Sequence, residues 1–143
     1  MPISMSKCKN RLATIWFVGA GLVFALMLLQ TLLGHYESAV SKAWGWALPT
    51  VMPTLSLIIG VLVVDLGGNA AKNVRVDSFV FKLAASLSIV YLCSVLLTML
   101  LQPLSPKSPS DALHLSNVWL GPFQGLVAAA IGAFFTRKGK GEQ

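Results

Sequence analysis

Apolar residues along this chain fall into four long runs with few polar members, each run about as long as a membrane is thick. The runs cover residues 13–33, 47–66, 79–101 and 118–136. At about 1.5 Å of rise per residue, each run would reach roughly 30 Å as an α-helix, the thickness of the hydrocarbon core of a bilayer. The pattern predicts an all-α integral membrane protein whose four transmembrane helices form one bundle and a single membrane domain over residues 1–143.

Composition strengthens this prediction. The chain is 55% hydrophobic and 11% charged, whereas an average soluble domain carries about a quarter charged residues. Such a chain could not cover its own surface in water. The tails and loops outside the four runs are too short to fold alone, so we expect no second domain.

Basic residues predict the orientation, because Lys and Arg accumulate on the cytoplasmic side of membrane proteins. Only Lys42 and Lys107 lie in the first and third loops. The two tails and the second loop carry Lys7, Lys9, Arg11, Lys72, Arg75, Arg137, Lys138 and Lys140. We therefore expect a multi-pass protein of the bacterial inner membrane with both termini in the cytoplasm. Its basic face would attract anionic lipid, at about 1 kcal/mol per residue. No folded basic surface with stacking aromatics is expected, which argues against nucleic acid as a partner.

Small residues recur every four positions in the fourth run. They are Gly121, Gly125, Ala129 and Ala133. Helices in lipid associate by close backbone approach, and a stripe of small residues permits it. Two interpretations remain open: packing within the chain against Gly21 and Ala25 of the first run, or an interface between subunits of a homo-oligomer.

Polar residues form a second pattern, on one side of the third run. They are Ser88, Tyr91, Ser94, Thr98 and Gln102. Hydroxyls can bond to their own helix backbone, so this row is either a packed interior face or the wall of a water-filled path. Gln124, inside the fourth run, must bond to something other than lipid. It is a candidate for an interhelical hydrogen bond and for pore lining.

Two ionisable residues lie near the cytoplasmic ends of neighbouring runs. Asp65 and Lys82 are candidates for a structural ion pair or for a gate, because ionisable groups within a membrane are costly unless paired. In the outer loops, His35, Glu37, Asp111 and His114 have no strong metal-ligand spacing, so we expect no metal or other cofactor. No catalytic motif is present, and we do not expect an enzyme.

The segments between the runs carry weaker signals. Three prolines among the serines of 102–117 favour an extended, irregular loop. Residues 34–46 have helical spacing and two tryptophans, which favours either a helix lying flat on the outer leaflet or a loop with aromatic anchors. Pro49 and Pro53 are tolerated if the second helix starts near Leu48, and kink it if it starts earlier.

Three functions remain open from the sequence. The first is a homo-oligomer that forms or gates a pore, assembled through the small-residue stripe and lined by the hydroxyl row. The second is a non-conducting membrane subunit that docks a soluble cytoplasmic partner on the basic face, and the third is a small-molecule transporter. In size and span count the chain is similar to small multidrug transporters, phage holins and small membrane effectors of bacterial defence operons. Its first run lacks the acidic residue that small multidrug transporters place there.

Overall fold

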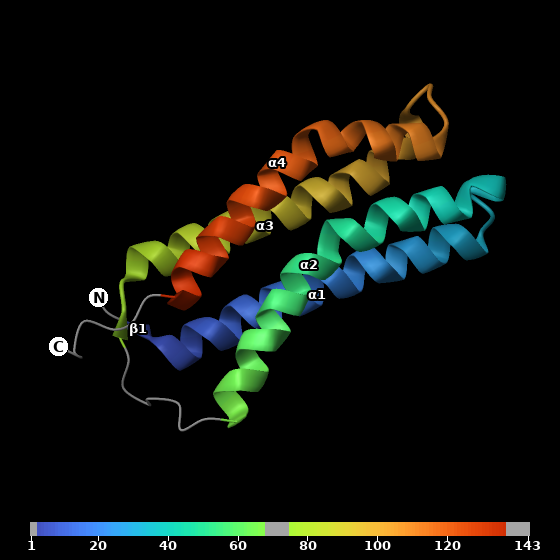
Figure 1. Ribbon diagram of the computed structural model, residues 1–143. Coiled ribbons are helices and arrows are strands. Elements are labelled where there is room, and N and C mark those ends of the chain that lie inside the picture. The colour runs from blue at the N-terminus through green and yellow to red at the C-terminus, as the bar shows by residue number, and fades with distance from the viewer. Residues whose placement is uncertain (1–2, 68–74, 137–143) are drawn as a thin grey trace.

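Four long helices make up nearly all of the computed structural model, which describes residues 3–67 and 75–136 (Figure 1). They are α1 (Met5–Leu32), α2 (Val40–Gly67), α3 (Ser78–Leu101) and α4 (Pro109–Thr136). α1 packs against α2 and α3, and α4 packs against the same two helices, so the four close into a bundle. Each helix is long and apolar enough to cross a membrane. The expected all-helical class with four candidate spans is confirmed.

Three helices begin roughly two turns before the apolar runs that predicted them. The apolar runs mark only the length that needs lipid, and polar residues extend the same helices beyond it. Between α1 and α2 the chain turns through Gly34, at a φ of 73°, and through a short 3₁₀ turn, Glu37–Ala39. Val40 then begins α2. Residues 40–46 are therefore neither a separate flat helix nor a loop but the first turns of α2, which corrects both interpretations.

The prediction of an irregular loop over 102–117 is also wrong for most of that segment. A 3₁₀ turn, Gln102–Leu104, follows α3, and α4 already begins at Pro109. Proline is tolerated in the first turn of a helix, where its missing N–H needs no partner. Ser108 and Asp111 hold this start: the Ser108 hydroxyl donates to Asp111 Oδ2 at 2.6 Å and accepts from the Asp111 amide at 3.4 Å. This reciprocal pairing resembles a capping box.

Pro49 and Pro53 lie inside α2, because this helix starts at Val40. A proline within a helix removes a backbone donor and clashes with the preceding turn, which bends the helix. Figure 1 shows α2 running beside α1 at first and then veering across it. Of the two alternatives given by the sequence, the structure therefore has the second: α2 starts early, and its prolines lie inside it where they bend it.

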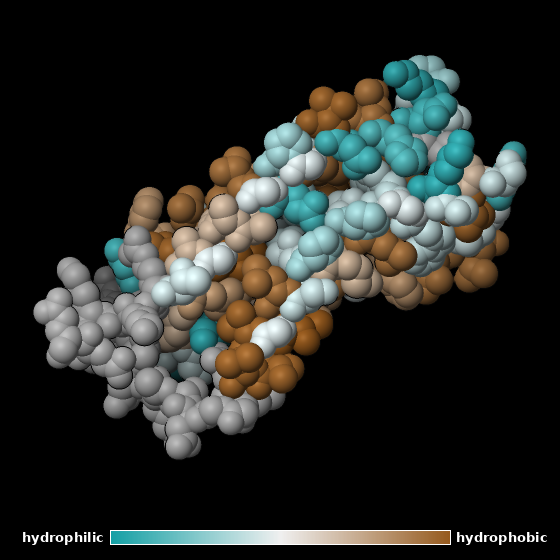
Figure 2. All heavy atoms as spheres, viewed as in Figure 1, coloured by the Kyte–Doolittle hydropathy of each residue, from teal (hydrophilic) through white to brown (hydrophobic). Residues whose placement is uncertain are grey.

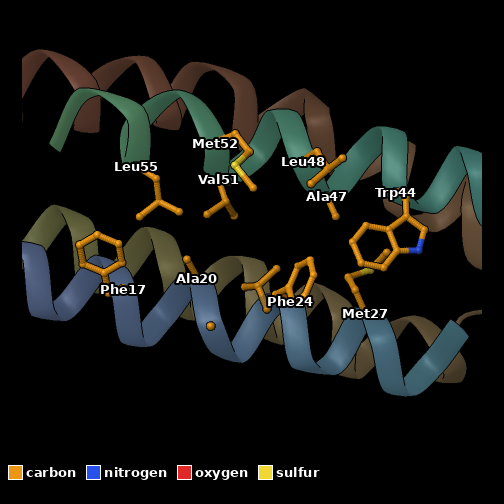
Figure 3. Close-up of a pocket in the computed structure, with 12 residues that line it drawn as sticks. Phe17, Ala20, Phe24, Met27, Trp44, Ala47, Leu48, Val51, Met52 and Leu55 are labelled. Carbon is orange, nitrogen blue, oxygen red and sulfur yellow. The ribbon is translucent and has the colours of Figure 1, made fainter. Parts of the chain in front are cut away.

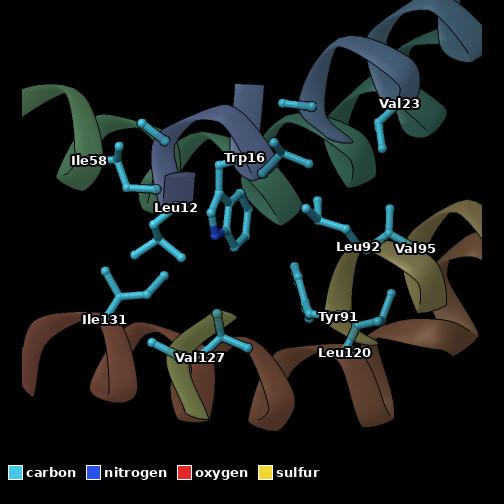
Figure 4. Packing of buried hydrophobic residues seen from close by; sticks show 14 of the residues in the cluster. Leu12, Trp16, Val23, Ile58, Tyr91, Leu92, Val95, Leu120, Val127 and Ile131 are labelled. Carbon is cyan, nitrogen blue, oxygen red and sulfur yellow. The ribbon is translucent and has the colours of Figure 1, made fainter. Parts of the chain in front are cut away.

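The core lies along the middle of the bundle and draws side chains from all four helices (Figure 4). Trp16 of α1 is fully buried and its ring centroid lies 6.0 Å from that of Tyr91 on α3. α1 and α3 approach closely at Gly19, where a Cβ would stand only 2.5 Å from Leu92 Cδ1. Large apolar side chains thus fill the centre of the single chain.

Both ends of the described chain lie at the same end of the bundle (Figure 1). There, two short strands, β1 (Ile3–Ser4) and β2 (Arg75–Val76), pair antiparallel. The opposite end carries the turns between α1 and α2 and between α3 and α4. Figure 2 shows hydrophilic residues gathered towards that turn end, and hydrophobic residues mixed with paler ones of intermediate hydropathy along the middle of this face.

Candidate functional site

The polar row of α3 faces mostly into the bundle. Ser88 and Tyr91 are fully buried and Gln102 is nearly so, while Ser94 and Thr98 are partly exposed. Three hydroxyls donate to the carbonyl one turn earlier on their own helix: Ser88 to Ala84 at 2.7 Å, Ser94 to Val90 at 2.8 Å and Thr98 to Ser94 at 2.8 Å. Each of these hydroxyls therefore donates within its own helix, as serine and threonine hydroxyls in helices often do. Within one chain the row is therefore a packed face.

Tyr91 and Gln124 meet at the bend in α2. Pro53 has no N–H, so the carbonyl of Pro49 lacks the helical donor that it would otherwise have. Gln124 Nε2 of α4 donates to Pro49 O at 3.1 Å and to Thr50 O at 3.2 Å, and the Tyr91 hydroxyl donates to Thr50 O at 2.7 Å. Gln124 thus forms interhelical hydrogen bonds that satisfy a carbonyl freed by proline.

A second polar cluster, which the sequence interpretation missed, joins α1 to α3 at the turn end. The Tyr36 hydroxyl donates to Gln30 Oε1, and Gln102 Nε2 donates to Tyr36 Oη at 2.8 Å and to Gln30 Oε1 at 3.1 Å. Tyr36 is 2% exposed, and burial raises its pKa, with a smaller opposing effect from Gln102. Tyr36 therefore stays protonated and donates at neutral pH. Gln30 lies near the end of the first apolar run and Gln102 directly after the third. These two positions were the signal in the sequence that could have predicted the cluster.

The small-residue stripe of α4 lies on the outside of the single chain. Its four members are all exposed, and a Cβ added at Gly121 or Gly125 would meet nothing within 4 Å. Gly21 of α1 is equally open, so the two notches do not pack together here. Gly121 and Gly125 lie within one turn of Gln124, whose amide reaches Pro49, so this part of the stripe lies beside α2 where its prolines are. We call the exposed residues Pro49, Pro53, Gly121, Gly125, Ala129 and Ala133 the α2/α4 face.

The members of the predicted basic face that the structure describes lie at the end that holds both termini, whereas Lys42 and Lys107 lie at the turn end. Lys7 and Arg11 are exposed, and Lys9 Nζ stands 5.9 Å from the ring centroid of Phe135 at the end of α4. Arg75 enters only through its backbone, in β2. Lys72, Arg137, Lys138 and Lys140 lie outside the described residues. Of the expected ion pair, Lys82 is exposed, and the side chain of Asp65 lies outside the described part.

No family model, curated protein or solved structure matches this chain. Function therefore has to be inferred from the chain's own residues. Within residues 3–67 and 75–136, no three His, Cys, Asp or Glu side chains come together as metal ligands would. What these residues do present is a filled bundle with one outward face of small residues and prolines.

Proposed function

We propose that the protein is embedded in the bacterial inner membrane with both termini in the cytoplasm and self-associates through the α2/α4 face. The assembly forms or gates a pore. The exposure of the α4 stripe carries this proposal. Large apolar side chains, leucine and valine above all, are exposed on all four helices, whereas the stripe leaves the α4 backbone open to close approach by another helix.

Gln124 supports the same face. Its amide nitrogen donates to two carbonyls of α2, but within the described residues no group donates to its Oε1. The side chain of Gln124 is only partly buried. A carbonyl oxygen facing hydrocarbon is costly. A neighbouring copy offers this oxygen a polar partner, which lipid tails cannot.

The proposed pore runs between subunits rather than through one chain. The hydroxyl row that could have lined an internal path is packed, and Leu120, Val127 and Ile131 are buried in the centre beside it (Figure 4). Ser94 and Thr98, the partly exposed members of the row, are the ones available to a path at the surface.

Replacing Ala129 by leucine tests the proposal. The change adds bulk to the α2/α4 face, so we expect it to abolish self-association and, with it, ion release from proteoliposomes and toxicity on overexpression. Ala25→Leu is the matched control, because Ala25 is also exposed but lies on α1, diagonally across the bundle. Conduction by both variants, or none by the unaltered protein, would exclude this pore. A tag on the C-terminus reachable only from outside the cell would exclude the orientation.

A second function, docking of a soluble partner, is favoured by one observation. β1 pairs with β2, which brings the N-terminal segment with Lys7 and Arg11 beside Arg75. One end of the bundle thus collects cations from two separate segments of the chain. Co-purification of a cytoplasmic protein that is lost in a Lys7→Gln, Arg11→Gln variant, without any conduction by the purified chain, would favour docking over the pore.

A further inference from the structure

A groove lies between the facing sides of α1 and α2 (Figure 3). Its volume is about 260 Å³, and every residue that lines it is apolar. The walls include Phe17 and Phe24 of α1 and Leu48 and Leu55 of α2, and Gly21 forms part of the α1 side. Figure 3 shows the labelled side chains of the two helices pointing towards each other across the gap.

The groove has the length of one leaflet and the width of one hydrocarbon chain. From Phe17 to Met27 it follows α1 for about 15 Å, roughly half the hydrocarbon thickness. With about 30 Å³ for each methylene, close to the volume of a water molecule, it holds roughly nine methylenes. α1 and α2 pack against each other as neighbours, which leaves less room between them than the about 10 Å that an α-helix needs.

One end of the groove lies at the depth where the hydrocarbon tail of a lipid joins its headgroup. Trp44 closes it at the turn end, where its Nε1 donates to Thr31 Oγ1 at 3.1 Å. The Phe24 ring packs edge-on against Trp44, with 5.5 Å between ring centroids. Tryptophan favours the depth of the lipid headgroups. From that depth the groove runs inwards to the middle of the bilayer.

We propose that this groove binds one acyl chain of a phospholipid from the leaflet at the turn end of the bundle. The inference rests on the proposed membrane embedding. A helix of a second copy fits less well, because close helix packing uses small residues. Ala20, Gly21 and Ala47 are small, but the other lining residues carry large apolar side chains. Flexible apolar side chains around a narrow space instead suit a flexible hydrocarbon chain.

Retention of lipid tests the proposal. The protein is reconstituted into phosphatidylcholine vesicles and extracted in mild detergent, and phosphatidylcholine bound to each chain is counted by native mass spectrometry. We expect one retained molecule per chain. In Gly21→Leu, occupancy should fall roughly tenfold, because the leucine side chain fills nearly half of the groove and displaces packing contacts. A Cβ at Gly21 meets no atom within 4 Å, so the fold tolerates this change.

Ala25→Leu is the control, since Ala25 is exposed one turn along α1 but does not line the groove. Equal retention in both variants, or none in the unaltered protein, overturns the proposal. A lipid-free dimer that Gly21→Leu dissociates also overturns it, by showing a second copy in the groove. Carbonate extraction separates the two failures: a chain that washes off refutes the membrane embedding itself, whereas an embedded chain without lipid refutes only the groove.

Discussion

The hydrogen bonds of Gln124 to α2 yield the sharpest test of how this bundle is held together. We expect Gln124→Leu to destabilise the fold, because the Pro49 carbonyl would then lose its donor from α4 while Pro53 supplies none. Pro53→Ala restores an N–H one turn after Pro49. In that background, the loss of Gln124 should therefore cost much less.

The magnitudes follow from the two bonds that Gln124 makes. Leaving a carbonyl without a donor where no water reaches it costs about 1–3 kcal/mol, the expected effect of Gln124→Leu alone in a membrane. After Pro53→Ala, only the bond to Thr50 is lost, and an interhelical hydrogen bond in a membrane protein averages about 0.6 kcal/mol. The two substitutions should thus couple by about 1 kcal/mol, which exceeds the ~0.5 kcal/mol scatter of independent sites.

Unfolding in mixed micelles with increasing sodium dodecyl sulfate, followed by tryptophan fluorescence, measures these free energies. Pro49→Ala is the matched control, because its new N–H serves Gly45 and leaves the Pro49 carbonyl unpaired. Gln124→Leu should keep its full cost there. If Gln124→Leu costs the same in all three backgrounds, the idea that it replaces the donor missing at Pro53 is wrong.

Two further predictions concern the contacts of α1. Gly19→Leu should destabilise the bundle by about 1–3 kcal/mol through overpacking against Leu92, and Leu92→Ala should relieve part of that cost in the same unfolding assay; simple additivity would contradict the close approach. In Tyr91→Phe, which leaves Tyr36 as the one tyrosine, the phenolate absorbance should appear above the ordinary pKa of 10.0. Burial favours the neutral phenol of Tyr36. The stability that the neutral phenol contributes is therefore complete below pH 10 and is lost as the pH rises through the raised pKa. A titration midpoint at or below pH 10 would contradict the burial of Tyr36.

The four helices could be predicted because lipid-length apolar runs leave few alternatives. Their ends could not be predicted as well, since polar residues continue α1, α2 and α4 beyond the apolar runs. One missed signal was readable: serine followed three residues later by aspartate, with proline between them, marks the start of α4 at Ser108. The pairing of Ile3 with Val76 joins segments far apart in sequence and left no local trace.

The candidate sites were found as residues but not as arrangements. A helical wheel places Ser88 and Tyr91 on one side of a helix, yet only the packing of α3 against its neighbours shows that this side faces inwards. Gln124 was expected to need a partner, but its partner depends on prolines in another helix. The groove is formed jointly by residues of α1 and α2, and no pattern within either helix encodes it.

The chain folds as two helical hairpins, α1 with α2 and α3 with α4, and different interactions join the two hairpins at opposite ends of the bundle. At one end, β1 pairs with β2 through two residues each, and Lys9 Nζ stands 5.9 Å from the ring centroid of Phe135. At the other, Gln30, Gln102 and Tyr36 tie the hairpins by several hydrogen bonds. Because several hydrogen bonds converge at the turn end, that end fixes how the second hairpin sits against the first, and the packed core continues the contact towards the strands.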